Sequence, residues 1–313
     1  MEKTWDAEQN VAQAAVTESA AGSQSVGKAT WRDFVNLAKP GIIFSNLITT
    51  FGGFWIASKW DINWLTLVIA MVGAALVMGA GCVLNNYLDR DMDIKMERTR
   101  KRALPTGKVH PKTVLAYGIT LGVVGTAILA TANMLTALLG LLGFFVYVWV
   151  YTAWLKRTSV WSTTIGAISG AMPAVIGYAA VTERLDMGAL LLFLIMFLWQ
   201  PPHFWALGIR RVEDYRAAGY PLLPVVRGIY QTKVSMMRYV IPLVPVSMLL
   251  YLYDYVGVFY LISSAVLGLI WVVMCMAGFR AKDDEQWAKK VFLFSINYLT
   301  LLFLIMVIDT VGQ

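Results

Sequence analysis

Three oxygen-bearing side chains stand four residues apart in one stretch of this 313-residue chain, at Asn85, Asp89 and Asp93. On a helix, each step of four residues turns a side chain by only about 40°, so the three face one direction over about 12 Å. Carboxylates at this spacing repel each other unless a cation lies between them. Mg²⁺ accepts one or two carboxylates and completes its shell with waters and substrate phosphates. The spacing therefore predicts a magnesium-binding helix face.

Basic residues follow this helix face directly, in a run that includes Arg98 and Arg102. The planar guanidinium group of arginine matches phosphate oxygens through two parallel hydrogen bonds. Carboxylates, Mg²⁺ and arginine beside apolar segments together indicate a site for a lipid diphosphate. The alternative is a solvated charge run that only fixes the topology of the chain.

A second polar group begins at His203, just after Pro201 and Pro202. The proline pair is expected to break one helix and start another, because proline is tolerated in a first helical turn. Arg210 and Asp214 follow His203 by seven and eleven residues, which places all three within roughly 20° of one line. The pattern predicts a polar stripe on one helix face, just outside the membrane. The alternative is a structural or interfacial histidine.

The remaining candidate residues are basic. Lys156 and Arg157 form a pair between two apolar segments, where anchoring at the membrane surface is the default interpretation. Arg211 is turned about 80° from His203 on the expected helix and is a candidate for contact with lipid phosphates.

The composition indicates the scaffold that must hold these groups. Hydrophobic residues make up 58% of the chain and charged residues 14%, against roughly 45–50% and about 25% in soluble domains. A bilayer span takes about 20 mostly apolar residues. The prediction is an all-α, polytopic membrane bundle over residues 36–313, after a flexible cytoplasmic tail over 1–35. Nine segments qualify as transmembrane helices, at about 41–58, 64–88, 113–131, 134–154, 160–181, 187–208, 236–253, 257–279 and 291–309.

The basic residues also predict an orientation. With the N-terminus in the cytoplasm, 24 of the 26 Lys and Arg residues lie on the cytoplasmic side, and only Lys59 and Arg184 lie opposite. The positive-inside rule therefore predicts a cytoplasmic N-terminus and an external C-terminus. The net charge of +7 is explained by these loops, so no nucleic-acid partner is expected.

Four stretches carry a resemblance to a known family, which extends over about residues 30–309. The first resembles the aspartate motif of the UbiA superfamily of intramembrane prenyltransferases, and reads NNYLDRDMDIKMERTRKR (85–102). The other three are similar to its protohaem IX farnesyltransferase branch, and read YTAWLKRTS (151–159), GAISGAMPAVIGYAA (166–180) and WQPPHFWALGIRRVEDYRAAGYPLLPVV (199–226).

Two features distinguish the chain within that superfamily. Quinone-pathway members generally carry a second Asp-rich motif, whereas this chain has His203 with Arg211 and Asp214. Trp161 stands where the branch often has asparagine.

The resemblance implies transfer of a farnesyl group from farnesyl diphosphate to a vinyl group of haem b, with water addition giving haem O for terminal oxidases. It implies Mg²⁺ as cofactor, the cell membrane of a bacterium with its lipid as the location, and a haem A synthase as a further partner. The implied roles are diphosphate-bound Mg²⁺ on Asp89 and Asp93 with help from Asn85, diphosphate on Arg98 and Arg102, diphosphate or haem propionates on Lys156 and Arg157, and a substrate-binding mouth of His203, Arg210, Arg211 and Asp214.

Two alternatives stay open at this stage. One is another UbiA-type prenyltransferase with an aromatic quinone precursor as acceptor. The other is a haem transporter or assembly factor without catalysis. The second is disfavoured because a path for ions across the membrane would require ionisable residues within the spans. The spans carry almost none away from the cytoplasmic face.

Overall fold

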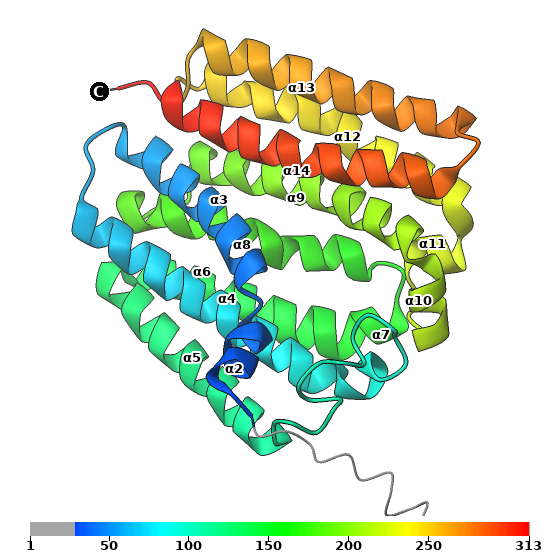
Figure 1. The fold of residues 1–313 in the computed structure, drawn as a ribbon. Coiled ribbons are helices and arrows are strands. Elements are labelled where there is room, and N and C mark those ends of the chain that lie inside the picture. Colours follow the sequence, from blue (N-terminus) through cyan, green and yellow to red (C-terminus); the bar gives the residue numbers. More distant parts are fainter. Residues whose placement is uncertain (1–28, 313) are drawn as a thin grey trace, which may run out of the picture.

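The computed structural model describes residues 29–312, and this part of the chain is an all-α bundle (Figure 1). It contains nine helical spans long and apolar enough to cross a membrane, so the predicted fold class and span number are confirmed. The spans are α3 (Pro40–Ser58), α4 (Trp64–Asp93), α5 (Pro111–Ala132), α6 (Met134–Phe145) continued by η1 (Val146–Leu155) and α7 (Lys156–Thr158), α8 (Ser162–Thr182), α9 (Met187–Arg210), α12 (Gly228–Leu252), α13 (Val258–Ala277) continued by η2 (Gly278–Arg280), and α14 (Asp284–Ile308).

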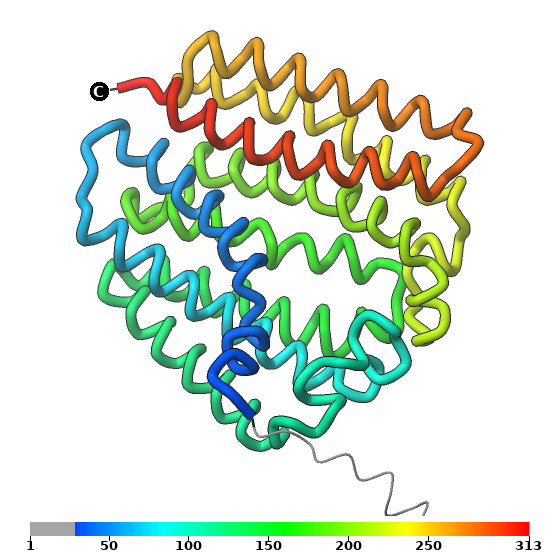
Figure 2. Tube along the Cα trace, in the orientation of Figure 1, coloured from blue at the N-terminus to red at the C-terminus, as the bar shows by residue number. Residues whose placement is uncertain are grey.

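Three short helices lie outside the spans, namely α2 (Trp31–Ala38), α10 (Val212–Ala218) and α11 (Leu223–Val226). Figures 1 and 2 show them at the same end of the bundle as α7 and the loop between α4 and α5. The C-terminal end of the described chain lies at the opposite end, where Trp60 Nε1 donates to the carbonyl of Thr310 over 2.8 Å. An odd number of spans therefore separates the two ends of the described bundle.

The predicted tail needs one correction at its boundary. Residues 31–35 belong to α2, whereas residues 1–28 of that prediction lie outside the described residues. A capping box starts this helix, because the Thr30 backbone N–H and hydroxyl both donate to Asp33 Oδ2, at 2.9 and 2.8 Å. Lys39 then turns the chain into α3 with a left-handed backbone, at φ 56°.

Glycine permits a close helix crossing between α3 and α8. A Cβ atom on Gly53 would lie 2.0 Å from the carbonyl oxygen of Ala174, and one on Gly177 would lie 1.9 Å from that of Thr50. Both positions therefore exclude any side chain. Such close backbone approach is the usual basis of helix association in membranes.

The expected helix break at Pro201 and Pro202 is wrong. Helix α9 runs through both prolines and ends at Arg210. Prolines within membrane helices are tolerated where neighbouring structure supports the helix, and the indole of Trp199 donates to the carbonyl of Ser295 on α14 at 2.8 Å. The chain instead leaves helical geometry at Arg211, at φ −124° and ψ 24°, before α10 begins.

Candidate active site

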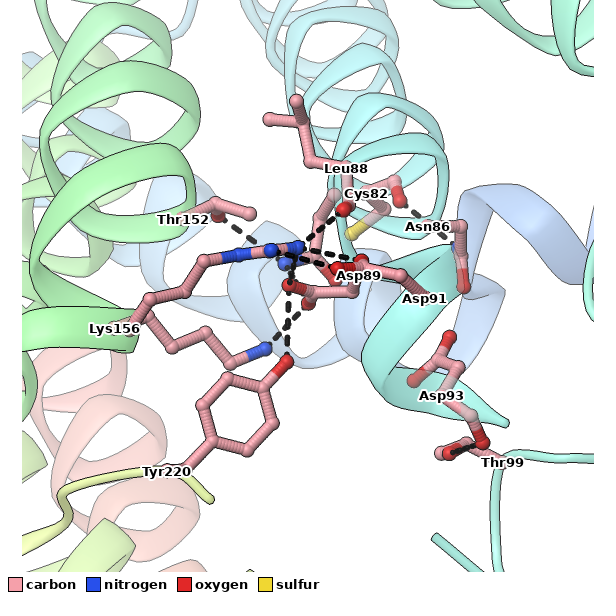
Figure 3. A network of polar contacts seen from close by, with 12 residues as sticks. Cys82, Asn86, Leu88, Asp89, Asp91, Asp93, Thr99, Thr152, Lys156 and Tyr220 are labelled. Atoms are coloured by element: carbon pink, nitrogen blue, oxygen red, sulfur yellow. Dashed lines mark hydrogen bonds and ion pairs between the residues drawn. The ribbon is translucent and has the colours of Figure 1, made fainter. Parts of the chain in front are cut away.

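Asp89 is the centre of a buried polar network near the end of α4. Its side chain is only 1% exposed. One carboxylate oxygen, Oδ2, accepts hydrogen bonds from Asn85 Nδ2 at 2.9 Å and from Lys156 Nζ at 2.5 Å. The other, Oδ1, accepts one from the hydroxyl of Tyr220 at 3.1 Å. Figure 3 shows Lys156 and Tyr220 approaching this carboxylate from separate parts of the chain.

Asn85 links this carboxylate to two other segments. Its amide nitrogen also donates to Thr152 Oγ1 at 3.1 Å, and its amide oxygen accepts from Lys39 Nζ at 2.8 Å. Helix α4 thus turns Asn85 and Asp89 to one side, as the spacing predicts. Lys39 was not among the predicted site residues. The only sequence signal for it was a lysine at the start of the first span, which was counted as a topology charge.

Asn85, Asp89 and Asp93 form one side of α4, which is called the acidic face below. Asp93 lies one turn beyond Asp89, because the helix extends five residues past the predicted end at 88. Arg102 Nη1 contacts its Oδ2 at 2.7 Å, and Thr99 donates to its backbone carbonyl at 2.8 Å. Arg98 is exposed and makes no ion pair within residues 29–312. It lines a pocket of about 260 Å³ together with Asp33, Asn36, Leu37, Asn86, Lys101, Arg102 and Ala103.

A π-helical segment, η1, brings Thr152 and Lys156 to the site. Helices of this type are rare and are frequently found at functional sites. Thr152 Oγ1 donates to the carbonyl of Tyr147 at 2.8 Å while accepting from Asn85. The rings of Tyr147 and Tyr151 stack with centroids 5.7 Å apart. A π-helix has more residues per turn than an α-helix. The apolar pattern of this span did not predict that local change.

Arg157 lies at the edge of the network and is held mainly by Asp91. Two of its nitrogens contact the Asp91 carboxylate at 2.9 and 2.8 Å, and one also reaches the carbonyl of Leu88 at 2.5 Å. Its distance to Asp89 Oδ1 is 4.0 Å. Asp91 itself is exposed, because it lies two residues from Asp89 and so points to another side of α4.

Tyr220 is a site residue for which the sequence offered no separate signal. It lies in the loop between α10 and α11 and is buried with Met96 and Ala218, packed by Met92, Tyr215 and Leu222. This cluster joins the loop after α4 to the segment after α9. Burial, followed by the nearby Asp89 carboxylate, raises the pKa of Tyr220, so its phenol stays protonated and donates to Asp89.

His203 and Arg210 do not lie in a polar mouth, which corrects the predicted stripe. The His203 ring is buried between those of Trp199 and Phe292, with centroid distances of 4.5 and 4.7 Å. Its Nδ1 pairs with Ser295 Oγ at 2.7 Å. The Arg210 guanidinium lies 5.6 Å from the centroid of Phe292, so both residues face α14.

Arg211 and Asp214 complete the set of predicted residues. Arg211 is exposed at the break that ends α9, and Asp214 is half-buried on α10. Within the described residues neither forms an ion pair. The predicted alignment of Asp214 with His203 and Arg210 is wrong. It assumed one continuous helix from His203 to Asp214, whereas the backbone at Arg211 is not helical.

The electrostatic surroundings favour an anion. Lys39, Lys156 and Arg102 approach the acidic face from three different segments. Burial lowers the pKa of Lys39 to about 8, and the charges of Arg102 and Lys156 contribute in the same direction. Positive charge is therefore concentrated beside the two buried carboxylates.

The donor set fits a metal ion held jointly with a substrate. No cluster of three or more His, Cys, Asp or Glu side chains suited to a metal occurs in residues 29–312. Asp89 and Asp93 are hard oxygen donors and both are buried. Two carboxylates match the share that proteins usually contribute to Mg²⁺, with substrate phosphates and waters supplying the rest.

Two solved structures share this fold. A digeranylgeranylglyceryl phosphate synthase aligns with a TM-score of 0.76 at 18% identity, covering 89% of this chain and 97% of its own. A UbiA homologue from Archaeoglobus fulgidus, solved with GPP and Mg²⁺, aligns with a TM-score of 0.67 at 15% identity, covering 88% and 99%. This chain therefore has the same fold as these two membrane proteins, with similarity over most of each chain.

The sequence comparison identifies the family. Residues 46–297 match the UbiA prenyltransferase family, and the chain belongs to it. Protoheme IX farnesyltransferase 1 of Bacillus subtilis is 52% identical over 293 residues, covering 90% of this chain and 92% of its own. Protoheme IX farnesyltransferase of Alkalihalophilus pseudofirmus is 48% identical over 304 residues, covering 96% of both chains. That of Acinetobacter baylyi is 45% identical over 272 residues, covering 87% and 93%.

Proposed function

We propose that this chain transfers a farnesyl group from farnesyl diphosphate to a vinyl group of protohaem IX, the haem b of the cell, and so produces haem O. The observation that carries the donor half is the buried Asp89 carboxylate with three cations near it. Lys156 and Arg102 are paired with carboxylates, whereas Lys39 has no carboxylate partner among residues 29–312. Relatives that are 45–52% identical over most of both chains support the acceptor half, because each is named for this reaction.

In the proposed donor site, the carboxylates bind the metal and the basic side chains bind the diphosphate. Asp89 and Asp93 hold the metal together with the diphosphate, and Asn85 orients Asp89 through its amide N–H. Bound Mg²⁺ supplies positive charge to the diphosphate as it departs. Lys156 and Arg102 lie within hydrogen-bond reach of the same two carboxylates and stabilise the leaving group, and Arg98 guides diphosphate from the adjoining pocket.

Water exclusion is the second requirement of this chemistry. Breaking the allylic C–O bond leaves a farnesyl cation that water would capture. The spans around the acidic face are apolar, and their buried core consists largely of aliphatic and aromatic side chains. The vinyl group forms the new C–C bond, and the resulting cation takes a hydroxyl group from water with release of a proton. The apolar bundle therefore delays water until the C–C bond exists.

The acceptor end is assigned from polar residues that are at least partly exposed. Arg157 is partly exposed near the acidic face, and Arg211 is exposed at the end of α9. We assign both to the haem propionates, and Asp214 follows Arg211 on the half-buried side of α10. His203 and Arg210 act through the packing of α9 against α14, and His203 positions that helix without ligating haem iron.

The chain is a multi-pass membrane protein, and its proposed location is the bacterial cell membrane with lipid around the spans. The 24 basic residues assigned to one side support a cytoplasmic N-terminus and an external C-terminus. A haem A synthase is the proposed recipient of the product where haem A is made.

The test is a comparison of two acceptors. Membranes containing this chain are supplied with farnesyl diphosphate, Mg²⁺, haem b and a 4-hydroxybenzoate-type quinone precursor, and the products are identified by mass. The proposal predicts a haem that has gained one farnesyl group and one hydroxyl, with the quinone precursor unchanged. Prenylation of the quinone precursor alone would establish the alternative acceptor class, and no prenylated product would favour a transporter or assembly factor.

A further inference from the structure

Lys39 is a basic side chain without a carboxylate partner next to the acidic face. Its Nζ donates to the amide oxygen of Asn85 at 2.8 Å, and no carboxylate lies within ion-pair distance of it in residues 29–312. An ammonium group has three N–H donors, and only one of them has a partner among the described residues. Placing a charge in a partly buried site is costly unless an anion compensates it.

The neighbouring cations differ from Lys39 in this respect. Lys156 pairs with Asp89, and Arg102 pairs with Asp93. Asn85 stands between Lys39 and Asp89, with its oxygen toward the lysine and its nitrogen toward the carboxylate. The two carboxylates are therefore matched by two cations, and Lys39 adds one positive charge in excess.

We propose that Lys39 binds the diphosphate of the prenyl donor as a third cation of the site, and that its contact with Asn85 turns the Asn85 amide so that the N–H group faces Asp89. The inference rests on the proposed function for the identity of the donor. It assigns two tasks to one side chain at the junction of α2 and α3. Two unused N–H donors are available to phosphate oxygens, while the third keeps the Asn85 amide in place.

Helix α3 provides a matched control for this lysine. Lys59 ends the helix that Lys39 precedes, and both have a left-handed backbone, with φ of 47° and 56°. Lys59 lies at the end of α3 away from α4's acidic face, where its side chain has no hydrogen bond or ion pair within the described residues. Replacing each lysine by glutamine in turn therefore distinguishes two effects. Only Lys39→Gln removes a cation of the site, whereas both variants remove a lysine that flanks α3.

The experiment measures binding of inorganic pyrophosphate with Mg²⁺ to the purified full chain in lipid nanodiscs, by calorimetry and without any acceptor. Lys39→Gln keeps an N–H donor for Asn85 but removes the charge. A hydrogen bond to a charged group contributes enough that pyrophosphate affinity is expected to fall about tenfold to hundredfold. Lys39→Arg should remain within about threefold of the wild type, since the charge is kept, and Lys59→Gln should be unchanged.

Turnover provides a second readout that a purely structural role would not reproduce. Lys39→Gln should raise the KM for farnesyl diphosphate with the KM for haem unaltered. If Lys39→Gln does not fold, Lys39→Gly replaces it, because glycine adopts the left-handed backbone without strain. The same loss of pyrophosphate affinity is expected for that variant.

Wild-type affinity for pyrophosphate in Lys39→Gln or Lys39→Gly, alongside a clear loss in Lys156→Gln, would overturn the inference. Failure of the wild type itself to bind pyrophosphate would refute both this inference and the donor half of the proposed function. Pyrophosphate binding that depends on Lys39, in a protein that makes no prenylated haem, would refute only the proposed acceptor.

Discussion

Asp89→Asn is expected to remove most farnesyl transfer while the protein still folds and inserts. The change replaces a negative oxygen of the acidic face by a neutral amide in a side chain that is only 1% exposed. Removal of one preorganised electrostatic group of an active site lowers kcat by about 10²–10³-fold. Because Asp89 is also a proposed metal ligand, the variant should need more Mg²⁺ than the wild type, and its rate at saturating Mg²⁺ should stay below that of the wild type.

The same substitution has a calculable effect on stability. Lys156 loses its carboxylate partner, and its side chain is 17% exposed. Breaking a fully buried pair costs about 3–5 kcal/mol, and the remaining solvent contact of Lys156 places the expected loss at the bottom of that range. Adding Lys156→Met to Asp89→Asn removes the uncompensated charge. The double variant should recover part of the thermal stability and none of the activity.

Asp91→Asn is the matched control on the same helix. Asp91 is 57% exposed and pairs with Arg157 outside the acidic face. Its loss should change the free energy of unfolding by less than about 1 kcal/mol, as for other surface ion pairs, and leave the Mg²⁺ dependence and the KM for farnesyl diphosphate near wild type. The assay is farnesyl transfer in membranes across a Mg²⁺ titration, with thermal unfolding measured on the same samples. Near-normal turnover by Asp89→Asn would refute the assignment of the acidic face.

The remaining predictions concern the loop, the buried histidine and the topology. Tyr220→Phe removes one hydrogen bond to the Asp89 carboxylate and should lower kcat/KM by about tenfold, whereas an unchanged value would exclude a role for the phenol. His203→Ala empties the space between two aromatic rings and should cost about 2–4 kcal/mol of stability, with the absorption spectrum of bound haem unaltered. A nitrogen-ligated haem spectrum in the wild type that disappears in His203→Ala would contradict the positioning role. A reporter fused after Gln313 should be active only if it functions outside the cytoplasm, and a cytoplasmic signal would refute the proposed orientation.

Local periodicity explains what the sequence could predict. Asn85 and Asp89 share a helix face because their spacing matches the helical turn, and this holds wherever α4 lies in the bundle. The nine spans follow from apolar length alone, and all nine occur in the described residues. The place of Arg102 near the acidic face agrees with its position in the basic run after α4, although its contact with Asp93 was not predicted.

Long-range packing accounts for what the sequence could not predict. Lys39 and Tyr220 reach the acidic face from segments 46 and 131 residues away from their partners, and no local pattern connects them. The π-helical turns of η1 change the register that brings Lys156 to Asp89. His203 faces α14 because α9 continues through its prolines, and that course depends on contacts made by Trp199 with a helix far along the chain.

Mass analysis of haem is the most direct test of the proposed reaction. Membranes that contain this chain as their only candidate farnesyltransferase are supplied with farnesyl diphosphate and Mg²⁺, and the extracted haem is compared with that from the Asp89→Asn variant. The proposed function predicts haem that has gained one farnesyl group and one hydroxyl in the wild type, and unmodified haem b in the variant. Unmodified haem b in both samples, from protein that is folded and inserted, would contradict it.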